Sequence, residues 1–272
     1  MQLRTIRTFL AISECGQLNR AADLLNVTQS TITARLNSLE EELGQSLFHR
    51  RKSGAELTSA GFRFERYAQL LIDTWRQARQ ETALPETVES TFNLGCHPDL
   101  WPNLGDQLLA WMNDNQKNLA ISVWSGDQHE LDRWLTNGLI DTAICYSPTV
   151  VDNRTIHSLP PDDIVLVATE LGNSPGNDKQ YVYVDGGETF RKEYAIAYTD
   201  IESPTLTFGS AIWACAHLLN NSGSGYLPRR LIQKELQSGD LFENFVAKSF
   251  KRNIYIVLSG KNEFVETWVD QL

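Results

Sequence analysis

The sequence contains little that would build a redox centre, a metal site or a membrane span. Its four cysteines are scattered without a C-x-x-C pair, which gives neither a zinc site nor a disulfide framework. The five histidines lack H-x-x-x-H and H-E-x-x-H spacing, and no P-loop, G-x-S-x-G or dinucleotide-binding glycine motif occurs. No run of about 18 apolar residues exists, and the polar N-terminus carries no secretory signal. We therefore expect a cytoplasmic protein with reduced thiols, without membrane association, metal or cofactor, and not an enzyme.

The composition is that of a folded protein, and the charge is unevenly distributed. Hydrophobic residues make up 42% and charged residues 21% of 272, which excludes disordered and collagen-like chains and suggests about two domains. A net charge of -10 argues, taken alone, against a nucleic-acid partner. Residues 1–80 nevertheless hold 11 basic and 8 acidic side chains, leaving 13 and 26 for the remaining 192. Such asymmetry indicates a basic binding module joined to an acidic domain.

Residues 1–60 predict three short helices followed by a wing. Helical spacing of apolar residues indicates a first helix that Gly16 ends with a left-handed cap, and a second helix over about residues 19–25. Thr28 is a good N-cap for the third helix. One apolar stripe of this helix is formed by Ile32, Leu36, Leu39 and Leu43.

The opposite side of the third helix carries short or amide-bearing side chains. These are Ser30, Thr33 and Asn37, with Gln29 at the helix start. Amides and hydroxyls suit base edges and phosphates, although an ordinary polar helix face is the alternative. Residues 46–58 then predict two short strands around a basic turn. The turn contains Arg50, Arg51 and Lys52, which suit phosphate contacts unless they form only a solvated charge cluster.

Four segments in this region carry a family resemblance. They are AADLLNVTQSTIT (21–33), LEEELG (39–44), LFHR (47–50) and LTSAG (57–61). In this order they resemble the winged helix-turn-helix of LysR-type transcriptional regulators. The resemblance implies that Gln29, Ser30, Thr33 and Asn37 contact bases and that Arg20, Arg35 and Arg50 contact the DNA backbone. Thr33 stands where the family usually has Ser, and residues 17–19 replace its usual Ser-aromatic-Thr, which bears on the target sequence. Together with the cap and the wing, the predicted DNA contacts are Arg20, Thr28, Gln29, Ser30, Thr33, Arg35, Asn37, Arg50 and Arg51.

A linker, residues 61–89, follows the DNA-binding domain of residues 1–60. It contains a helix that Thr58 caps, that runs to about Thr82, and that Pro85 terminates. Its apolar seam is formed by Phe64, Tyr67, Leu71, Thr74 and Ala78, broadened by Phe62, Leu70 and Trp75. Such a seam suits helix pairing, with packing on its own domain as the alternative. The family resemblance favours pairing, hence a homodimer or homotetramer that contacts two half-sites of double-stranded DNA.

Residues 90–272 alternate between predicted strands and helices. A βαβαβ order over residues 91–146 predicts a parallel sheet with ligands at the carboxyl ends of its strands. Further strands are expected over residues 164–169, 181–185, 195–198 and 254–258, and helices over 210–220 and 263–272. Residues 223–228 are expected to lead into a strand and a turn. The fold class is therefore an α+β winged helix-turn-helix, a long linker helix and an α/β two-lobed domain. The last of these resembles the family's effector domain, of the periplasmic-binding-protein type, in a short form. Lobe I would comprise residues 90–150 and 253–272, and lobe II residues 151–252.

A small-molecule effector is expected between the two lobes. By position, the candidate contacts are His97, Asp99, Gly126, Asp127, Tyr146, Thr207 and Ser210. Free amides at helix starts favour an anion, which Asp99 and Asp127 oppose unless a cation or an amine is also bound. For each residue, an ordinary loop position is the alternative.

The sequence as a whole predicts a LysR-type regulator that binds specific DNA and responds to an effector. Effector binding would change the arrangement of the lobes and thereby DNA bending or contact with RNA polymerase. A small-molecule-binding protein without a DNA role and an enzyme on an α/β fold are the alternatives. The missing secretory signal counts against the first, and the missing catalytic motifs count against the second.

Overall fold

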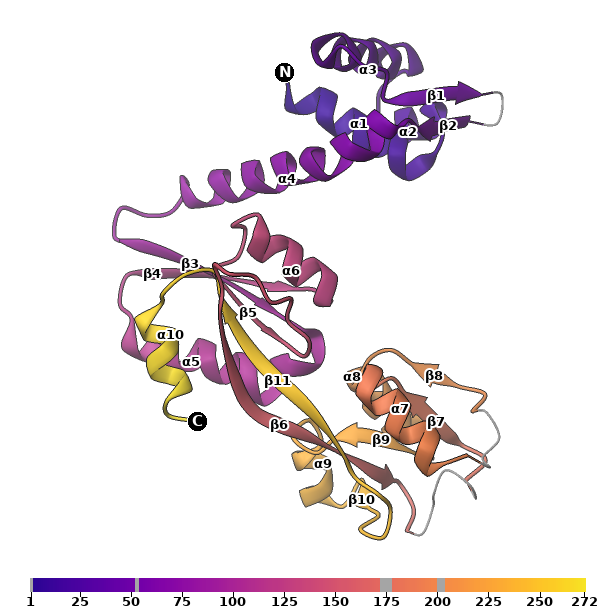
Figure 1. Ribbon diagram of the computed structural model, residues 1–272, viewed down its shortest axis with the longest axis vertical. Coiled ribbons are helices and arrows are strands. Elements are labelled where there is room, and N and C mark those ends of the chain that lie inside the picture. The colour runs from indigo at the N-terminus through magenta and orange to yellow at the C-terminus, as the bar shows by residue number, and fades with distance from the viewer. Residues whose placement is uncertain (1, 52–53, 172–177, 200–203) are drawn as a thin grey trace. The chain divides into compact units, whose positions relative to one another are not determined.

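The computed structural model describes residues 2–51, 54–171, 178–199 and 204–272. It divides into two compact units, Met1–Pro85 and Glu86–Leu272, which we describe separately. Figure 1 labels their helices and strands along the chain. Among the described residues, no helix combines the length and the apolar content needed to cross a bilayer.

The N-terminal unit contains four helices and a hairpin within its described residues. They are α1 (Leu3–Cys15), α2 (Leu18–Leu24), α3 (Gln29–Leu43), β1 (Phe48–Arg51), β2 (Gly54–Leu57) and α4 (Ser59–Glu81). Gly16 and Gly44 end α1 and α3 in the left-handed conformation, which glycine adopts without steric cost. The hydroxyls of Thr28 and Thr58 cap α3 and α4 by accepting the amides of Thr31 and Gly61. The predicted helix boundaries and caps are thus confirmed.

The core of this unit joins α1 to both α4 and the hairpin. The ring of Phe9 lies 5.2 Å from that of Phe48 and 5.0 Å from that of Phe64. Ile32, Leu36 and Leu39 of α3 are fully buried against the same core. Because the stripe of α3 faces inward, its polar side faces away from the core.

Two predicted apolar positions lie elsewhere. Leu43 is 40% exposed, so the buried stripe of α3 ends at Leu39. Phe64 packs into the core of the N-terminal unit, whereas the predicted seam of α4 placed it beside Tyr67 and Leu71. The helix has two apolar sides, one facing its own core and one exposed.

The C-terminal unit begins with the predicted βαβαβ arrangement. Its elements are β3 (Ser90–Cys96), α5 (Asp106–Asn115), β4 (Leu119–Ser125), α6 (Gln128–Thr136) and β5 (Thr142–Cys145). Strand β3 pairs in parallel with both β4 and β5, as expected. Between β3 and α5, short helical turns over Pro98–Leu100 and Trp101–Gly105 carry the chain away from the sheet edge.

The rest of the chain adds a mixed set of strands and helices, the last of which packs in the core of lobe I. They are β6 (Thr155–Ala168), β7 (Tyr181–Val184), α7 (Glu188–Ala197), β8 (Thr207–Phe208), α8 (Ala211–Asn221), β9 (Ser224–Pro228), α9 (Gln233–Ser238), β10 (Phe242–Glu243), β11 (Phe250–Leu258) and α10 (Glu263–Val269). In the described part of the chain the strand order is β4-β3-β5-β11-β6-β9-β7-β8, with β10 beside β6. The predicted strand over residues 195–198 is wrong, since residues 195–197 end α7. The side chains of Tyr194 and Tyr198 pack on Tyr226, so their burial does not require a strand.

Two long antiparallel strands, β6 and β11, run through both lobes (Figure 1). The first half of β6 pairs with β11 beside β5, so lobe I also takes in the start of β6. Beyond it, β6 pairs with β9 of lobe II. The register between β6 and β11 shifts between Arg252 and Ile254. This irregularity lies where the ribbon passes from one lobe to the other.

Candidate functional site

Helix α3 presents a polar surface on a rigid helix-turn-helix. Gln29, Ser30 and Asn37 are exposed, and Thr33 is half-buried. The Thr28 hydroxyl accepts the Thr31 amide at 3.3 Å, so it holds the start of the helix. The geometry therefore supplies amide and hydroxyl groups along one helix face, the groups that suit base edges.

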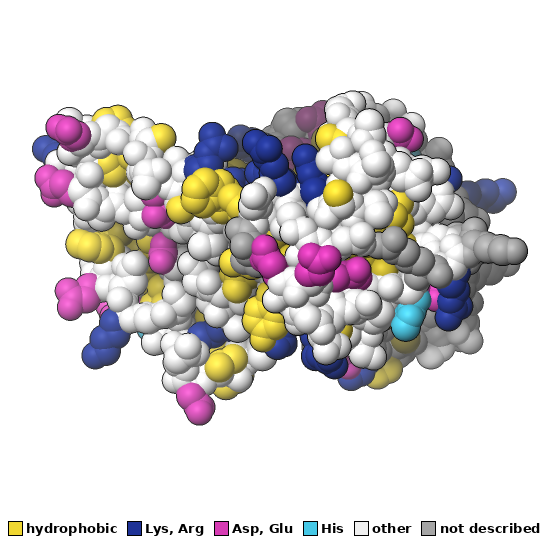
Figure 2. Space-filling model, turned by 90° about the horizontal axis from the view of Figure 1, so that it is seen from above, with side chains coloured by type: hydrophobic (Ala, Val, Ile, Leu, Met, Phe, Trp, Pro, Cys, Tyr) yellow, Lys and Arg dark blue, Asp and Glu magenta, His cyan; other side chains and the backbone are white. Residues whose placement is uncertain are grey.

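Basic side chains flank this helix. Arg20 is exposed and Arg35 half-buried, while Arg51 pairs with Glu56 at 3.2 Å, both side chains being exposed. Arg50 occupies β1 opposite Ala55, and Lys52 lies outside the described residues. In Figure 2 several Lys and Arg side chains lie together near the upper edge of the face in view, and Asp and Glu lie elsewhere on it. Individual basic side chains are available to contact phosphates.

Asp99 connects the two lobes of the C-terminal unit. Its carboxylate is 2% exposed and accepts hydrogen bonds from Ser210 Oγ (2.8 Å) and from the amides of Ala211 (3.0 Å) and Ile212 (3.2 Å). It thereby neutralises the positive N-terminal end of α8, where free amides would otherwise attract an anion. Asp99 of lobe I thus occupies the position at the start of α8, in lobe II, where a bound anion could otherwise lie.

Arg230 makes a second connection between the lobes. Its guanidinium donates two hydrogen bonds to buried Asp162 (2.9 and 3.0 Å) and others to the carbonyls of Asp99 (2.9 Å) and Pro102. Burial opposes the charge of Arg230, but the bonds to Asp162 outweigh it and raise the pKa of the guanidinium. Asp162 also accepts the Tyr146 hydroxyl at 3.3 Å. One carboxylate thus joins Arg230 to the end of β5.

His97 lies next to this network as a neutral imidazole. Its ring meets that of Tyr146 edge-on at 5.0 Å, and its Nδ1 accepts the Asp99 amide at 3.2 Å. Burial lowers the pKa of His97 to about 4, with a further lowering from Arg252 and an opposing effect of Asp99. The uncharged ring therefore helps hold the loop that carries Asp99.

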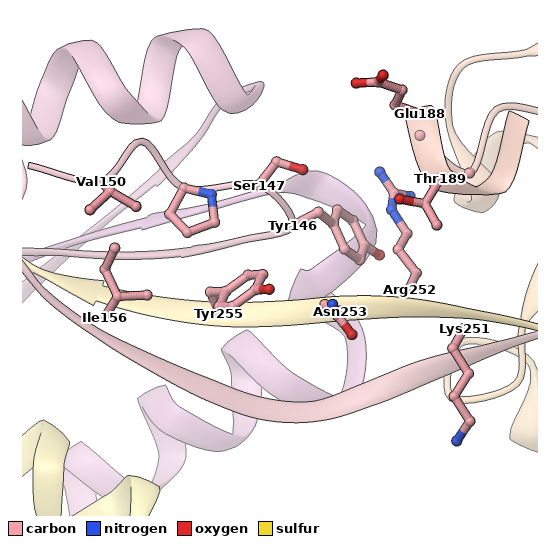
Figure 3. Close-up of a pocket in the computed structure, with 13 residues that line it drawn as sticks. Tyr146, Ser147, Val150, Ile156, Glu188, Thr189, Lys251, Arg252, Asn253 and Tyr255 are labelled. Atoms are coloured by element: carbon pink, nitrogen blue, oxygen red, sulfur yellow. The ribbon is translucent and has the colours of Figure 1, made fainter. Parts of the chain in front are cut away.

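A cavity of about 410 Å³ opens beside Tyr146 and takes side chains from both lobes. The apolar and aromatic part of its lining is Pro148, Val150, Ile156 and Tyr255, and the rest of the lining is Tyr146, Ser147, Gly186, Gly187, Glu188, Thr189, Lys251, Arg252 and Asn253. Figure 3 shows Arg252 and Thr189 at one end and Val150, Ile156 and Tyr255 at the other. The volume is within the range of small-molecule sites.

Comparison with known proteins decides the family. Residues 3–62 match the model of the bacterial regulatory helix-turn-helix proteins of the lysR family. The HTH-type transcriptional regulator HdfR of Shigella boydii is 27% identical over 271 residues, covering 97% of this chain and 95% of HdfR, and HdfR of Escherichia coli gives the same values. The chain is a LysR-type transcriptional regulator.

Solved structures agree with the fold of this LysR-type regulator. Full-length CbnR complexed with its target DNA is 20% identical, with a TM-score of 0.69 over 100% of this chain and 99% of CbnR. Vibrio fischeri DarR in complex with DNA is 18% identical, with a TM-score of 0.60 over 98% and 97% of the two chains. The winged head and the two-lobed domain are therefore the architecture of the family.

The predicted effector residues of the regulator occupy three different settings. His97, Asp99 and Ser210 belong to the connection between the lobes, and Tyr146 joins this connection to the cavity. Asp127 caps α6 by accepting the Glu130 amide at 2.8 Å. Two further positions complete the set: Gly126 lies against Trp134, and Thr207 is exposed in β8.

Sequence reasoning missed Arg230, Asp162 and Arg252. Arg230 follows residues 223–228, which were expected to lead into a strand and a turn, and there it resembles an ordinary solvated charge. Arg252 precedes the apolar run over residues 254–258, and a cation entering a buried strand was the available signal. Their importance comes from the pairing of β6 with β11 and β9, which composition does not reveal.

Proposed function

We propose that this regulator binds specific double-stranded DNA through α3 and the β1–β2 wing, and that a small molecule between the lobes controls transcription. The observation that carries the proposal is the exposed amide and hydroxyl face of α3 within a head that matches the lysR model. Gln29, Ser30, Thr33 and Asn37 contact base edges, and Arg20, Arg35, Arg50 and Arg51 contact phosphates. Thr28 acts by fixing the start of α3.

The regulator acts as a homodimer or homotetramer in the cytoplasm, with contact to RNA polymerase as a further consequence of DNA binding. The surface for pairing is the exposed row of Tyr67, Leu71 and Trp75 on α4, whose members recur every four residues. Apolar side chains in such a row gain free energy when a second helix covers them. Two paired heads contact two half-sites, which compensates for the modest charge of one head.

The effector occupies the 410 Å³ cavity that Lys251, Arg252 and Asn253 of β11 help to line. The N-terminus of α8 is filled by Asp99, so it does not serve as an anion site in this arrangement of the lobes. The cavity takes residues from the loop after β5 and from β6, α7 and β11, and Tyr146 connects it through Asp162 to Arg230. Tyr146 lines the cavity and also belongs to the contact between the lobes. A ligand in the cavity therefore alters that contact.

Selection of duplexes from a random DNA pool tests the DNA role. The wild-type chain should enrich a sequence motif, and its binding should weaken steeply with salt. Thr33→Ala should lower discrimination at one base pair by about 1–3 kcal/mol, whereas Arg50→Ala should weaken all sequences similarly. Ser38→Ala, on the flank of α3, is the control and should leave the motif unchanged. Small-molecule binding without any enrichment of DNA would instead support the alternative of a binding protein without a DNA role.

A further inference from the structure

Arg252 differs from the other buried arginines of the C-terminal unit. Arg154 pairs with Asp132 at 2.8 Å and Arg230 with Asp162 at 2.9 Å. Within the described part of the chain, the largely buried guanidinium of Arg252 has no carboxylate and no carbonyl as a hydrogen-bond partner. Its neighbour is the ring of Tyr146, with 3.3 Å between the guanidinium carbon and the ring centroid. Burial lowers the pKa of Arg252, and the electrostatic effects of Tyr146, Asp99, Asp162 and Asp185 offset this lowering only in part.

Other donors converge on the same end of the cavity. Helix α7 starts there without a side-chain cap, because Gly187 occupies its N-cap position. In the described residues the amides of Glu188, Thr189 and Phe190 have no acceptor. A Cβ atom at Gly187 would lie 3.6 Å from the guanidinium of Arg252, so this helix start is beside it, and Thr189 lines the same cavity (Figure 3). A carboxylate placed at this point would meet a guanidinium, a hydroxyl and a helix N-terminus.

The acidic groups nearby are already engaged. Glu188 accepts from Lys192 at 2.6 Å, and Asp185 accepts from Arg191 at 2.6 Å and from the Gly187 amide at 2.9 Å. The ammonium of Lys251 is 3.4 Å from Asp163 and points away from Arg252 in Figure 3. Apart from its contact with the Tyr146 ring, Arg252 is therefore the cation in the cavity that has no ion pair or hydrogen bond among the described side chains, and it repels a cationic ligand.

The opposite end of the cavity is apolar. Figure 3 shows Val150, Ile156 and Tyr255 on the side away from α7, and Pro148 also lines the cavity. Water forms few hydrogen bonds with these side chains. Covering them with a hydrocarbon or aromatic group is therefore favourable in free energy. The cavity thus has one anion-binding end and one apolar end.

We propose that the cavity binds a small organic acid, with its carboxylate on Arg252 and the start of α7 and its apolar body on Val150, Ile156 and Tyr255. This proposal rests on the proposed function for the regulatory consequence, but not for the binding itself. The carboxylate attracts Arg252 away from the face of Tyr146. Because the Tyr146 hydroxyl donates to Asp162, the change reaches the Arg230 contact between the lobes.

Calorimetric titration of the full chain with matched probes tests the proposal. Benzoate should bind saturably with a Kd in the millimolar range or below, as expected for a ligand of this size. Benzamide lacks the charge and acetate lacks the apolar body, so each should bind at least about tenfold more weakly. Equal binding of benzamide, binding of inorganic phosphate but not of benzoate, or no binding of benzoate at about 10 mM would each overturn the proposal.

Variants of the two neighbouring cations locate the site. Arg252→Gln should weaken benzoate binding at least about tenfold, whereas Lys251→Gln should change it less than about twofold. If Arg252 serves only to support the fold, Arg252→Gln lowers the midpoint of thermal unfolding. If it awaits an anion, removal of its unpaired charge leaves that midpoint unchanged or raises it. If the wild-type chain does not bind benzoate but still enriches a DNA motif, only the acid site is refuted, whereas absent DNA enrichment refutes the proposed function.

Discussion

Removal of the Asp99 carboxylate should cost far more stability than removal of a similar helix cap elsewhere. Asp99→Ala leaves the amides of Ala211 and Ile212 and the Ser210 hydroxyl without their acceptor, in a site that is 2% exposed. Hydrogen bonds to a charged group contribute about 1.5–3 kcal/mol each, and part of this is offset because a charge no longer has to be buried. We expect a net loss of about 3–5 kcal/mol in the free energy of unfolding.

Asp127→Ala is the matched control for Asp99→Ala. Asp127 also caps a helix and accepts a backbone amide, that of Glu130 at 2.8 Å, but it is exposed and both partners belong to lobe I. Its removal should cost about 1 kcal/mol. Asp99→Asn, which keeps the shape and one acceptor oxygen, should lie between the two.

Urea unfolding of the full chain, followed by tryptophan fluorescence, measures these differences. Hydrogen exchange of the Ala211 and Ile212 amides adds a local measurement, since both should exchange faster in Asp99→Ala and at wild-type rates in Asp127→Ala. If Asp99→Ala and Asp127→Ala lose the same stability, Asp99 does not join the lobes as described. Unchanged exchange at both amides would lead to the same conclusion.

Three further changes have defined outcomes. Because the pKa of His97 is about 4 in the folded chain, against about 6.5 when unfolded, the unfolded chain binds more protons between these values, and stability falls as the pH is lowered. Between about pH 7.5 and pH 5, the free energy of unfolding of His97→Gln should therefore fall by about 2 kcal/mol less than that of wild type, and an equal fall would contradict a buried neutral ring. Gly61→Ala should destabilise by about 1–3 kcal/mol although alanine favours helices, because its Cβ would collide with the Leu47 carbonyl; a stabilised variant in thermal unfolding would disprove this contact. Trp75→Glu should yield monomers in analytical ultracentrifugation and Thr74→Glu should not, whereas the reverse would restore the seam predicted from sequence.

Local signals predicted the head almost completely. Thr28, Gly44 and Thr58 act through neighbours within a few residues, so capping rules place the ends of α3 and α4. The seam of α4 was harder to predict, because Phe64 packs on Phe9, which lies far away in the sequence. A helix with two apolar sides does not reveal from its spacing which side pairs with another chain.

The site between the lobes was predictable by location but not by residue. The rule that ligands lie at the carboxyl ends of parallel strands led to the loops that contain His97, Asp99 and Tyr146. Whether a carboxylate there binds a ligand or the protein itself depends on Ser210, 111 positions further along the chain. Arg252 was missed because its significance is the absence of a partner, and this becomes visible only when the surrounding side chains have been placed.

The register shift between Arg252 and Ile254 also has a mechanical consequence. The ribbon of β6 and β11 is the structural axis shared by both lobes, and an irregularity in an antiparallel pair concentrates its bending and twisting at one residue. A rotation of about 10° there would displace a point about 20 Å along the ribbon, some six residues, by about 3–4 Å. A ligand in the proposed site would lie beside this shift, because Arg252 and Asn253 line the cavity. A small local change there would then be converted into a larger displacement of one lobe relative to the other.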